Sequence, residues 1–262
     1  MMLSDTLIRA PRTPGLHLLQ SRGRSGAREL STWRLRLAPG ERASHRLDDE
    51  ETVVVLQSGR GSFAAGALRW PVSRRDVFDE RATACYVPPG ESFEATAETD
   101  LEAILISTPA PRGGTPALAS PDDVVVNARG RGTYSRQVHD VFVRDAFVRR
   151  LMVGETFNPP GHWSSFPPHK HDGRDGEATL EEIYYFRINP PQGFGHQMLY
   201  AADGESVTHT VRDGDVVLLP YGYHPVSSPP GYDLYYLWAM AGAERKLALF
   251  EDPAHRWIHD IP

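Results

Sequence analysis

The stretch Gly214-Asp215-Val216-Val217-Leu218-Leu219-Pro220-Tyr221-Gly222-Tyr223-His224 leads from a short apolar segment into a proline–glycine turn that ends at a histidine. Four consecutive apolar residues between Gly-Asp and Pro-Tyr-Gly are typical of a buried β-strand followed by a tight turn. The first half of the chain holds a similar segment, Val87-Pro88-Pro89-Gly90. These turns indicate a protein of short strands whose two halves share features.

The rest of the chain also favours strands. Trp33, Leu35 and Leu37 alternate with arginines, which predicts a half-buried strand. The 262 residues include 23 glycines and 22 prolines, a surplus that fits many tight turns. A helical pattern is found only over 243–250, and it is weak. We therefore predict an all-β protein.

Spacings between the turns indicate an internal duplication. Gly40 lies 11 residues before Glu51 and 48 before Pro88, whereas Gly161 lies 21 before Glu182 and 59 before Pro220. One insertion of about ten residues before Glu182 explains both differences, although any two β-rich stretches can be aligned through their turns. We predict two β-barrel or jelly-roll domains, residues 1–110 and 133–262, joined by a Pro/Gly/Ala-rich linker over 111–132.

Charge and composition exclude several classes of protein. The net charge is −6, opposite in sign to that of a typical nucleic-acid-binding protein. No apolar run approaches the roughly 18 residues of a membrane helix. The single cysteine, Cys85, excludes an intrachain disulfide framework and favours the cytoplasm. We expect no nucleic-acid or membrane partner.

Four residues form a candidate metal site. His169 and His171 are two residues apart, so on a strand both imidazoles point to one face. Glu182 opens the next strong strand pattern, and His224 follows the Pro-Tyr-Gly turn. Three imidazoles and a carboxylate suit zinc, manganese, iron or nickel. The alternative is that these histidines are scattered, which we retain for the other eight: His17, His45, His139, His162, His196, His209, His255 and His259.

The order His-x-His, Glu, Gly-Asp-x-x-x-x-Pro-x-Gly and His resembles the two cupin motifs, with a longer gap before Glu182 and a Gly222–His224 spacing one residue shorter than usual. Further segments resemble the 5-deoxy-glucuronate isomerase family of bacterial myo-inositol catabolism, a family of cupin-type uronate isomerases. They are Val153-Gly154-Glu155-Thr156-Phe157-Asn158-Pro159-Pro160-Gly161, Trp163-Ser164-Ser165, Pro167-Pro168-His169-Lys170-His171-Asp172, Glu181-Glu182-Ile183-Tyr184-Tyr185, Ile188-Asn189-Pro190-Pro191-Gln192-Gly193-Phe194 and Gly231-Tyr232-Asp233-Leu234-Tyr235-Tyr236.

This resemblance implies a duplicated cupin (bicupin) whose second half binds one divalent metal, zinc first among the candidates. It places the carboxylate ligand at Glu182 rather than Glu181. The first half lacks the pattern, because Ser92 stands where His224 would fall and only His45 lies between Gly40 and Glu51. The implied reaction is an aldose–ketose isomerisation of 5-deoxy-glucuronate to 2-deoxy-5-keto-gluconate, in which a base moves a proton between adjacent carbons.

The sequence does not name that base. Tyr184, Gln197 and Tyr236 are expected on strands lining the barrel, and for each the alternative role is core packing. Arg136, Arg187 and Arg212 are unranked candidates to bind the carboxylate of a sugar-acid substrate. Three other functions stay open: isomerisation of a related deoxy-keto-uronate, a metal-dependent cupin dioxygenase, and a sugar-binding regulatory module. A homo-oligomeric state also stays open.

Overall fold

The computed structural model describes residues 2–24 and 26–260, and its regular structure is almost entirely β, which confirms the all-β prediction. The helices of these residues are short 3-10 turns: η1 (Leu3–Asp5), η2 (Gly132–Tyr134) and η3 (Arg256–Asp260). The strands are β1 (Leu7–Arg9), β2 (Gly15–Gln20), β3 (Ser31–Leu37), β4 (Arg42–Arg46), β5 (Glu50–Ala65), β6 (Leu68–Arg74), β7 (Ala84–Val87), β8 (Ser92–Ala97), β9 (Leu101–Pro109), β10 (Ala117–Ala119), β11 (Val125–Arg129), β12 (Arg136–Phe142), β13 (Met152–Asn158), β14 (Trp163–Ser164), β15 (His169–Lys170), β16 (Leu180–Asn189), β17 (Gly195–Tyr200), β18 (Ser206–Val211), β19 (Asp215–Leu219), β20 (Val226–Ser227), β21 (Asp233–Gly242) and β22 (Phe250–Glu251).

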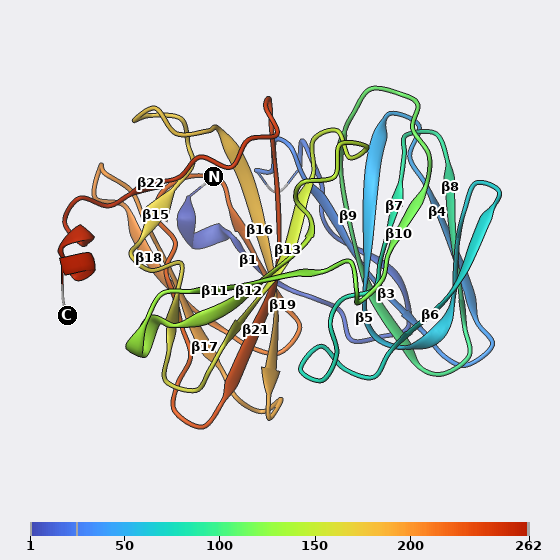
Figure 1. Cartoon of the computed structure of the whole chain (residues 1–262), viewed down its shortest axis with the longest axis horizontal. Coiled ribbons are helices and arrows are strands. Elements are labelled where there is room, and N and C mark those ends of the chain that lie inside the picture. Colours follow the sequence, from blue (N-terminus) through green and yellow to red (C-terminus); the bar gives the residue numbers. More distant parts are fainter. Residues whose placement is uncertain (1, 25, 261–262) are drawn as a thin grey trace.

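The strands gather into two units that lie side by side (Figure 1). The main sheet of the first unit contains the order β7-β5-β9-β3-β2, and that of the second contains β19-β16-β21-β13-β12. Each of these five strands has a counterpart at the same place in the other sheet. In the second unit, a smaller sheet of order β14-β20-β17-β18 supplies further strands.

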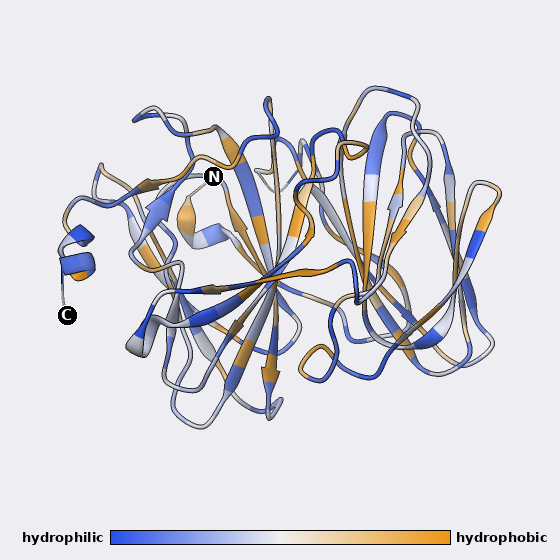
Figure 2. Ribbon diagram, viewed as in Figure 1, coloured by the Kyte–Doolittle hydropathy of each residue, from blue (hydrophilic) through white to orange (hydrophobic). Residues whose placement is uncertain are grey.

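Alternating side chains of the main sheets build three cores. Val53 and Val55 of β5 pack with Ile183 and Tyr185 of β16 in a core shared by both units. The intervening residues face the interior of their own unit, as Tyr184 does in the second. Both faces of these central strands are buried, so their sequences are continuous apolar runs. They appear as orange segments near the middle of Figure 2.

The expected helix over 243–250 is wrong. The chain there is irregular until Phe250, where β22 pairs with β15 in the register Lys170↔Phe250. The Asp252 backbone N–H also donates to the Pro168 carbonyl at 2.8 Å. These contacts satisfy the backbone through the tertiary structure, which outweighs a weak local helical preference.

The segment 111–132 is more ordered than a linker. Its β10 extends the first main sheet by pairing with β7, and its β11 extends the second by pairing with β12. At the other end of the chain, β1 pairs with β19 and thus belongs to the second sheet. The domain bounds 1–110 and 133–262 stay a prediction. The sheets depart from these bounds because β1 belongs to the second sheet and because β10 and β11, inside the expected linker, belong to sheets.

Two buried glutamates occupy corresponding positions and join the units. Glu51 precedes Thr52, which pairs with Val87, and Glu181 precedes Glu182, which pairs with Leu219. The Glu51 carboxylate accepts the backbone N–H groups of residues 149–151, just before β13. The Glu181 carboxylate accepts those of residues 28–30, just before β3. Each unit thus holds the chain that enters the other.

Candidate active site

The proposed metal ligands meet inside the second unit. Glu182 lies on β16 and faces the interior with Tyr184, as strand alternation requires, while Glu181 faces the other unit. His171 directly follows β15, and His224 follows the turn after β19. In that turn Gly222 has φ +82°, and a Cβ there would lie 2.5 Å from the Tyr200 carbonyl, so the turn requires glycine.

Three of these side chains form a tight cluster. The ligand atoms of His171, Glu182 and His224 lie within 4.8 Å of one another, and all three residues are buried. Glu182 Oε2 lies 3.0 Å from His171 Nε2 and 3.4 Å from His224 Nε2. His169 lies beside this cluster but outside it, with its ring centroid 4.8 Å from that of His224. The structure therefore brings together all four predicted residues, three of them closely.

The protonation states of the histidines differ. Burial lowers the pKa of His224 well below its ordinary value and, with the charges of His171 and Arg136, lowers the pKa of His169 to about 3. Burial opposes protonation of His171 too, but its hydrogen bond to Glu182 outweighs this and raises its pKa. Burial also raises the pKa of Glu182. Neutral imidazole is the form that binds metals.

The cluster fits a divalent transition metal. His224 Nε2 is buried and has no hydrogen-bond partner among the described residues, an arrangement that is costly unless a ligand fills the space. The far nitrogens are oriented by the backbone, since His171 Nδ1 contacts the Leu180 carbonyl at 2.9 Å and His224 Nδ1 the Gly222 carbonyl at 3.0 Å. Two imidazoles and a carboxylate, with His169 near, are ligands that such metals prefer.

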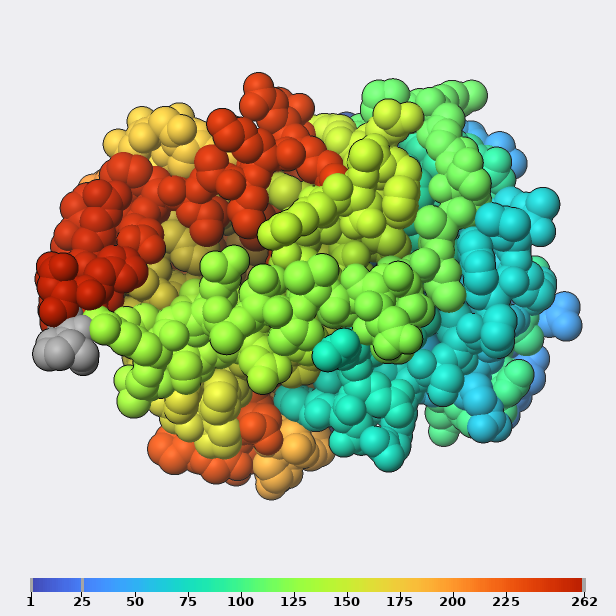
Figure 3. Space-filling model, viewed as in Figure 1, coloured from blue at the N-terminus to red at the C-terminus, as the bar shows by residue number. Residues whose placement is uncertain are grey.

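A cavity of about 810 Å³ opens next to the cluster, lined by Glu182 and His169. Its mouth lies between the C-terminal tail, red in Figure 3, and the green segment of β11 and β12. The tail contributes Leu247, Leu249 and Glu251 to the lining. The volume falls within the range of small-molecule sites.

Two predicted tyrosines line this cavity side by side. The rings of Tyr184 and Tyr236 stack with centroids 4.2 Å apart. Ser165 Oγ lies 3.0 Å from Tyr184 Oη and 3.5 Å from Tyr236 Oη, and Tyr236 Oη donates to Ser164 Oγ at 2.9 Å. Ser165 has φ +49°, a strained conformation for a residue other than glycine. Burial raises the pKa of Tyr184 well above its ordinary value.

Other candidates lie elsewhere. Gln197 does not line the cavity, because its amide nitrogen donates to the His224 carbonyl at 2.8 Å behind the cluster. Arg187 pairs with Asp213 at 2.8 Å, and Arg212 is exposed outside the cavity. Of the three predicted arginines, only Arg136 lines the cavity.

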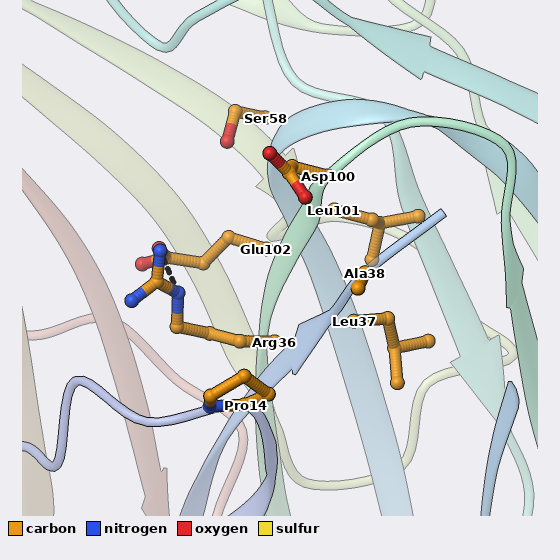
Figure 4. Close-up of a pocket in the computed structure, with 8 residues that line it drawn as sticks. All are labelled: Pro14, Arg36, Leu37, Ala38, Ser58, Asp100, Leu101 and Glu102. Carbon is orange, nitrogen blue, oxygen red and sulfur yellow. Dashed lines mark ion pairs between the residues drawn. The ribbon is translucent and has the colours of Figure 1, made fainter. Parts of the chain in front are cut away.

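The first unit has no comparable cluster among the residues that the structure describes. The His45 ring packs at a tilt against Trp33 with ring centroids 4.5 Å apart, and Ser92 is exposed at the start of β8. A small pocket between β3 and β9 of this unit is shown in Figure 4, where Arg36 pairs with Glu102 at 3.5 Å.

Sequence reasoning missed several residues of the site. Ser164 and Ser165 were noticed only as part of a motif. The available signal was the pair of serines one residue before the proline pair Pro167-Pro168. The tail was missed because its irregular backbone has no periodicity. Lys170 was also missed: it is buried and pairs with Asp172 and Asp175 at 2.8 Å each and with Glu177, so it anchors the inserted loop.

Comparison with known proteins agrees with these features. The model of the KduI/IolB family matches residues 12–258, nearly the whole chain. The chain belongs to the KduI/IolB family. A relative from Geobacillus kaustophilus, named 5-deoxy-glucuronate isomerase, is 41% identical over 230 residues, which are 85% of this chain and 83% of that protein. A Bacillus subtilis relative of the same name is 36% identical and covers 86% of this chain and 85% of its own length.

Solved structures extend the comparison for this KduI/IolB member. An IolB-like protein from Salmonella typhimurium is 34% identical, with a TM-score of 0.91 over 97% of this chain and 99% of that one. Oxalate decarboxylase from Lactobacillus farciminis is 12% identical, with a TM-score of 0.68 over 100% of this chain and 90% of that one, and it shares the fold alone. Among residues 2–24 and 26–260, no helix has the length and apolar character to cross a bilayer.

Proposed function

We propose that this protein is a 5-deoxy-glucuronate isomerase that converts 5-deoxy-D-glucuronate to 2-deoxy-5-keto-D-gluconate in myo-inositol degradation. The name shared by its relatives supports this function. The observation that carries it is the buried cluster of His171, Glu182 and His224 at the wall of a cavity large enough for a six-carbon acid. The sugar acid is the proposed partner, and the buried, unpaired Cys85 fits a cytoplasmic enzyme.

One divalent metal per chain would be held by His169, His171, Glu182 and His224, zinc being the first candidate and manganese, iron or nickel the alternatives. Such a metal supplies Lewis-acid polarisation of a carbonyl and its neighbouring hydroxyl. Gln197 would act as a positioning residue, because its amide holds the backbone of His224.

The two tyrosines would handle protons at the reacting carbons. In this isomerisation one proton moves from C2 of the aldose to C1, and a second moves from the C2 hydroxyl, which becomes the ketone, to the aldehyde oxygen, which becomes a hydroxyl. Tyr184 keeps its proton because of its raised pKa, so its hydroxyl suits hydrogen-bond donation to a substrate oxygen. Tyr236 stays a candidate for the group that moves the carbon-bound proton. Ser165 contacts both hydroxyls and would orient them.

We also propose a bicupin in which only the second barrel keeps a metal site. The equal strand order of the two main sheets supports the duplication, and the positions of His45 and Ser92 support the loss of the site from the first. Elemental analysis of the purified protein is expected to give one tightly bound metal per chain. Two tightly bound metals would contradict this assignment.

The decisive experiment is turnover of 5-deoxy-glucuronate by purified protein, before and after chelation and after metal is added back. We expect activity to fall with metal content and to return with it. In deuterium oxide, deuterium is expected on the hydroxymethyl carbon of the product, because a base near a cavity mouth exchanges its proton with water. Full retention of protium at low conversion would favour a hydride shift, and oxygen consumption would indicate a dioxygenase.

A further inference from the structure

Arginines are concentrated around the cavity. Five line it, and the carboxylates that accompany them are fewer. The lining arginines are Arg129, Arg136, Arg144, Arg245 and Arg256, and the lining acids are Asp140, Glu182 and Glu251. Glu182 belongs to the metal cluster, so the cavity has a cationic surplus that favours an anionic ligand.

Most of these arginines are occupied or exposed. Arg245 donates to the carbonyls of Leu151, Asp145 and Phe142 at 2.7–3.0 Å, which uses its whole guanidinium in holding the backbone. Arg256 donates to the Glu251 carbonyl and covers the Phe250 ring at 4.9 Å. Arg129 and Arg144 are exposed at the mouth. None of these four is suited to a specific contact deep in the cavity.

Arg136 differs from them. It is half-buried, and its Nη1 donates to the carbonyls of Tyr134 and Phe166 at 3.2 Å each. In the described part of the chain Arg136 forms no ion pair with an acidic side chain, and its Nε and Nη2 have no acceptor. Its cross-strand partner is another cation, Arg129. Like charges opposite each other on a sheet are destabilising without an anion between or beside them.

The local backbone makes room for this arrangement. Gly130 has φ +71°, and a Cβ there would lie 2.8 Å from Arg136 Nη1 and 2.2 Å from the Tyr134 carbonyl. Arg136 lines the same cavity as His169, Tyr184 and Tyr236, so its guanidinium lies beside the candidate site. A fixed, partly desolvated guanidinium with a free edge matches a carboxylate, which it can bind through two parallel hydrogen bonds.

We propose that Arg136 binds the carboxylate of the substrate and thereby selects acidic sugars over neutral ones. This inference rests on the proposed function for the identity of the acid. The carboxyl carbon of 5-deoxy-glucuronate lies at the opposite end of the sugar from C1 and C2. Arg136 would therefore hold the sugar by the end that does not react and direct the other end to the cluster.

The test compares binding of two ligands to metal-loaded protein by calorimetry. The probes are 5-deoxy-glucuronate and 5-deoxy-glucose, which carries a hydroxymethyl group in place of the carboxylate. Native protein is expected to bind the acid more tightly, and Arg136→Met is expected to remove roughly tenfold to a hundredfold of that preference. Arg136→Lys keeps the positive charge but cannot form two parallel hydrogen bonds, so it should retain only part of the preference for the acid. Arg144→Met, at the mouth, controls for general loss of positive charge.

The outcomes separate the inference from the proposed function. Metal content and thermal unfolding identify any Arg136 variant that has failed to fold, and in that case Arg136→Lys supplies the comparison. An Arg136→Met protein that still prefers the acid as native protein does would overturn the role of Arg136, whether or not the isomerase is active. Loss of the preference in a protein that never turns over 5-deoxy-glucuronate would support the carboxylate site and contradict the proposed reaction.

Discussion

Each histidine of the buried cluster has one nitrogen oriented by a backbone carbonyl, so its other nitrogen is aimed before a metal arrives. We expect His171→Ala and His224→Ala each to lower metal affinity by more than about tenfold with little change in fold, because the apolar cores of the two units do not need an ion to form. Metal content after dialysis, with circular dichroism, measures both effects. His45→Ala, in the first unit, is the matched control and should keep its metal.

The hydroxyl of Ser165 lies between two tyrosine hydroxyls. Ser165→Gly removes this hydroxyl while accepting φ +49° without strain, so we expect kcat to fall about tenfold or more with KM and thermal stability nearly unchanged. Steady-state kinetics and a melting curve test this. If kcat of the variant equalled that of the native protein, the Ser165 hydroxyl would have no role in the reaction.

The four candidate metal ligands could be predicted from sequence because their order along the chain is itself a signal. The preference for Glu182 over Glu181 came from the family resemblance, and the alternating cores agree with it. The sequence could not show that Gln197 lies outside the cavity lining. Its strand and direction follow from pattern, but whether its amide reaches the cavity or the backbone of His224 depends on how β17 packs against the turn.

Among the elements, the inserted loop between β15 and β16 is held by the buried Lys170. Burial raises the pKa of Glu177, but the ammonium of Lys170 outweighs this and holds the pKa of Glu177 at about 2. A carboxylate depressed from an unfolded value of about 4.3 adds stability above that pH and loses it as pH falls towards 2.

Glu177→Gln should therefore lower the free energy of unfolding by roughly 1–3 kcal/mol at pH 7 and flatten its decline between about pH 4 and 2. Urea unfolding at pH 7 and pH 3 measures the two values. Glu244→Gln, at an exposed position, is the control. An unchanged acid slope in the Glu177 variant would show that the pair with Lys170 contributes no pH dependence.

Element types were easier to predict from sequence than element partners. The continuous apolar run 216–219 predicted a strand that the structure contains, and the matched turn spacings predicted a repeat that stays a proposal. The short strands β10 and β11 were missed because each has three to five residues with mixed polarity, and their order comes from pairing with a sheet edge. The tail was misread for the same reason, since β22 is a strand only because β15 is beside it.

At the scale of the whole molecule, the two buried glutamates make the two units depend on each other. We expect Glu51→Gln and Glu181→Gln each to reduce the free energy of unfolding by about 2–4 kcal/mol, because a buried carboxylate that accepts three backbone N–H groups, one of them buried, is replaced by a weaker acceptor. Denaturant unfolding measures the loss.

A comparison of Glu181→Gln with Glu182→Gln distinguishes a structural role from a role in metal binding. Glu181→Gln should keep its metal and most of its kcat at low temperature, whereas Glu182→Gln, one residue away, should lose both. If Glu181→Gln proved the more damaging to metal binding, the assignment of the ligand would be wrong by one strand position.

The pairing of β1 with β19 also sets an order for biosynthesis. Leu7–Arg9 leave the ribosome some 200 residues before their partners at 215–217, and Leu3 fills the core around Tyr184. The sheet of the second unit is thus completed only if Leu7–Arg9 are still free to pair when β19 has been made. A bulky fusion immediately before Leu3, or a fragment that starts at residue 133, would leave the edge of β19 open to other chains and invite aggregation.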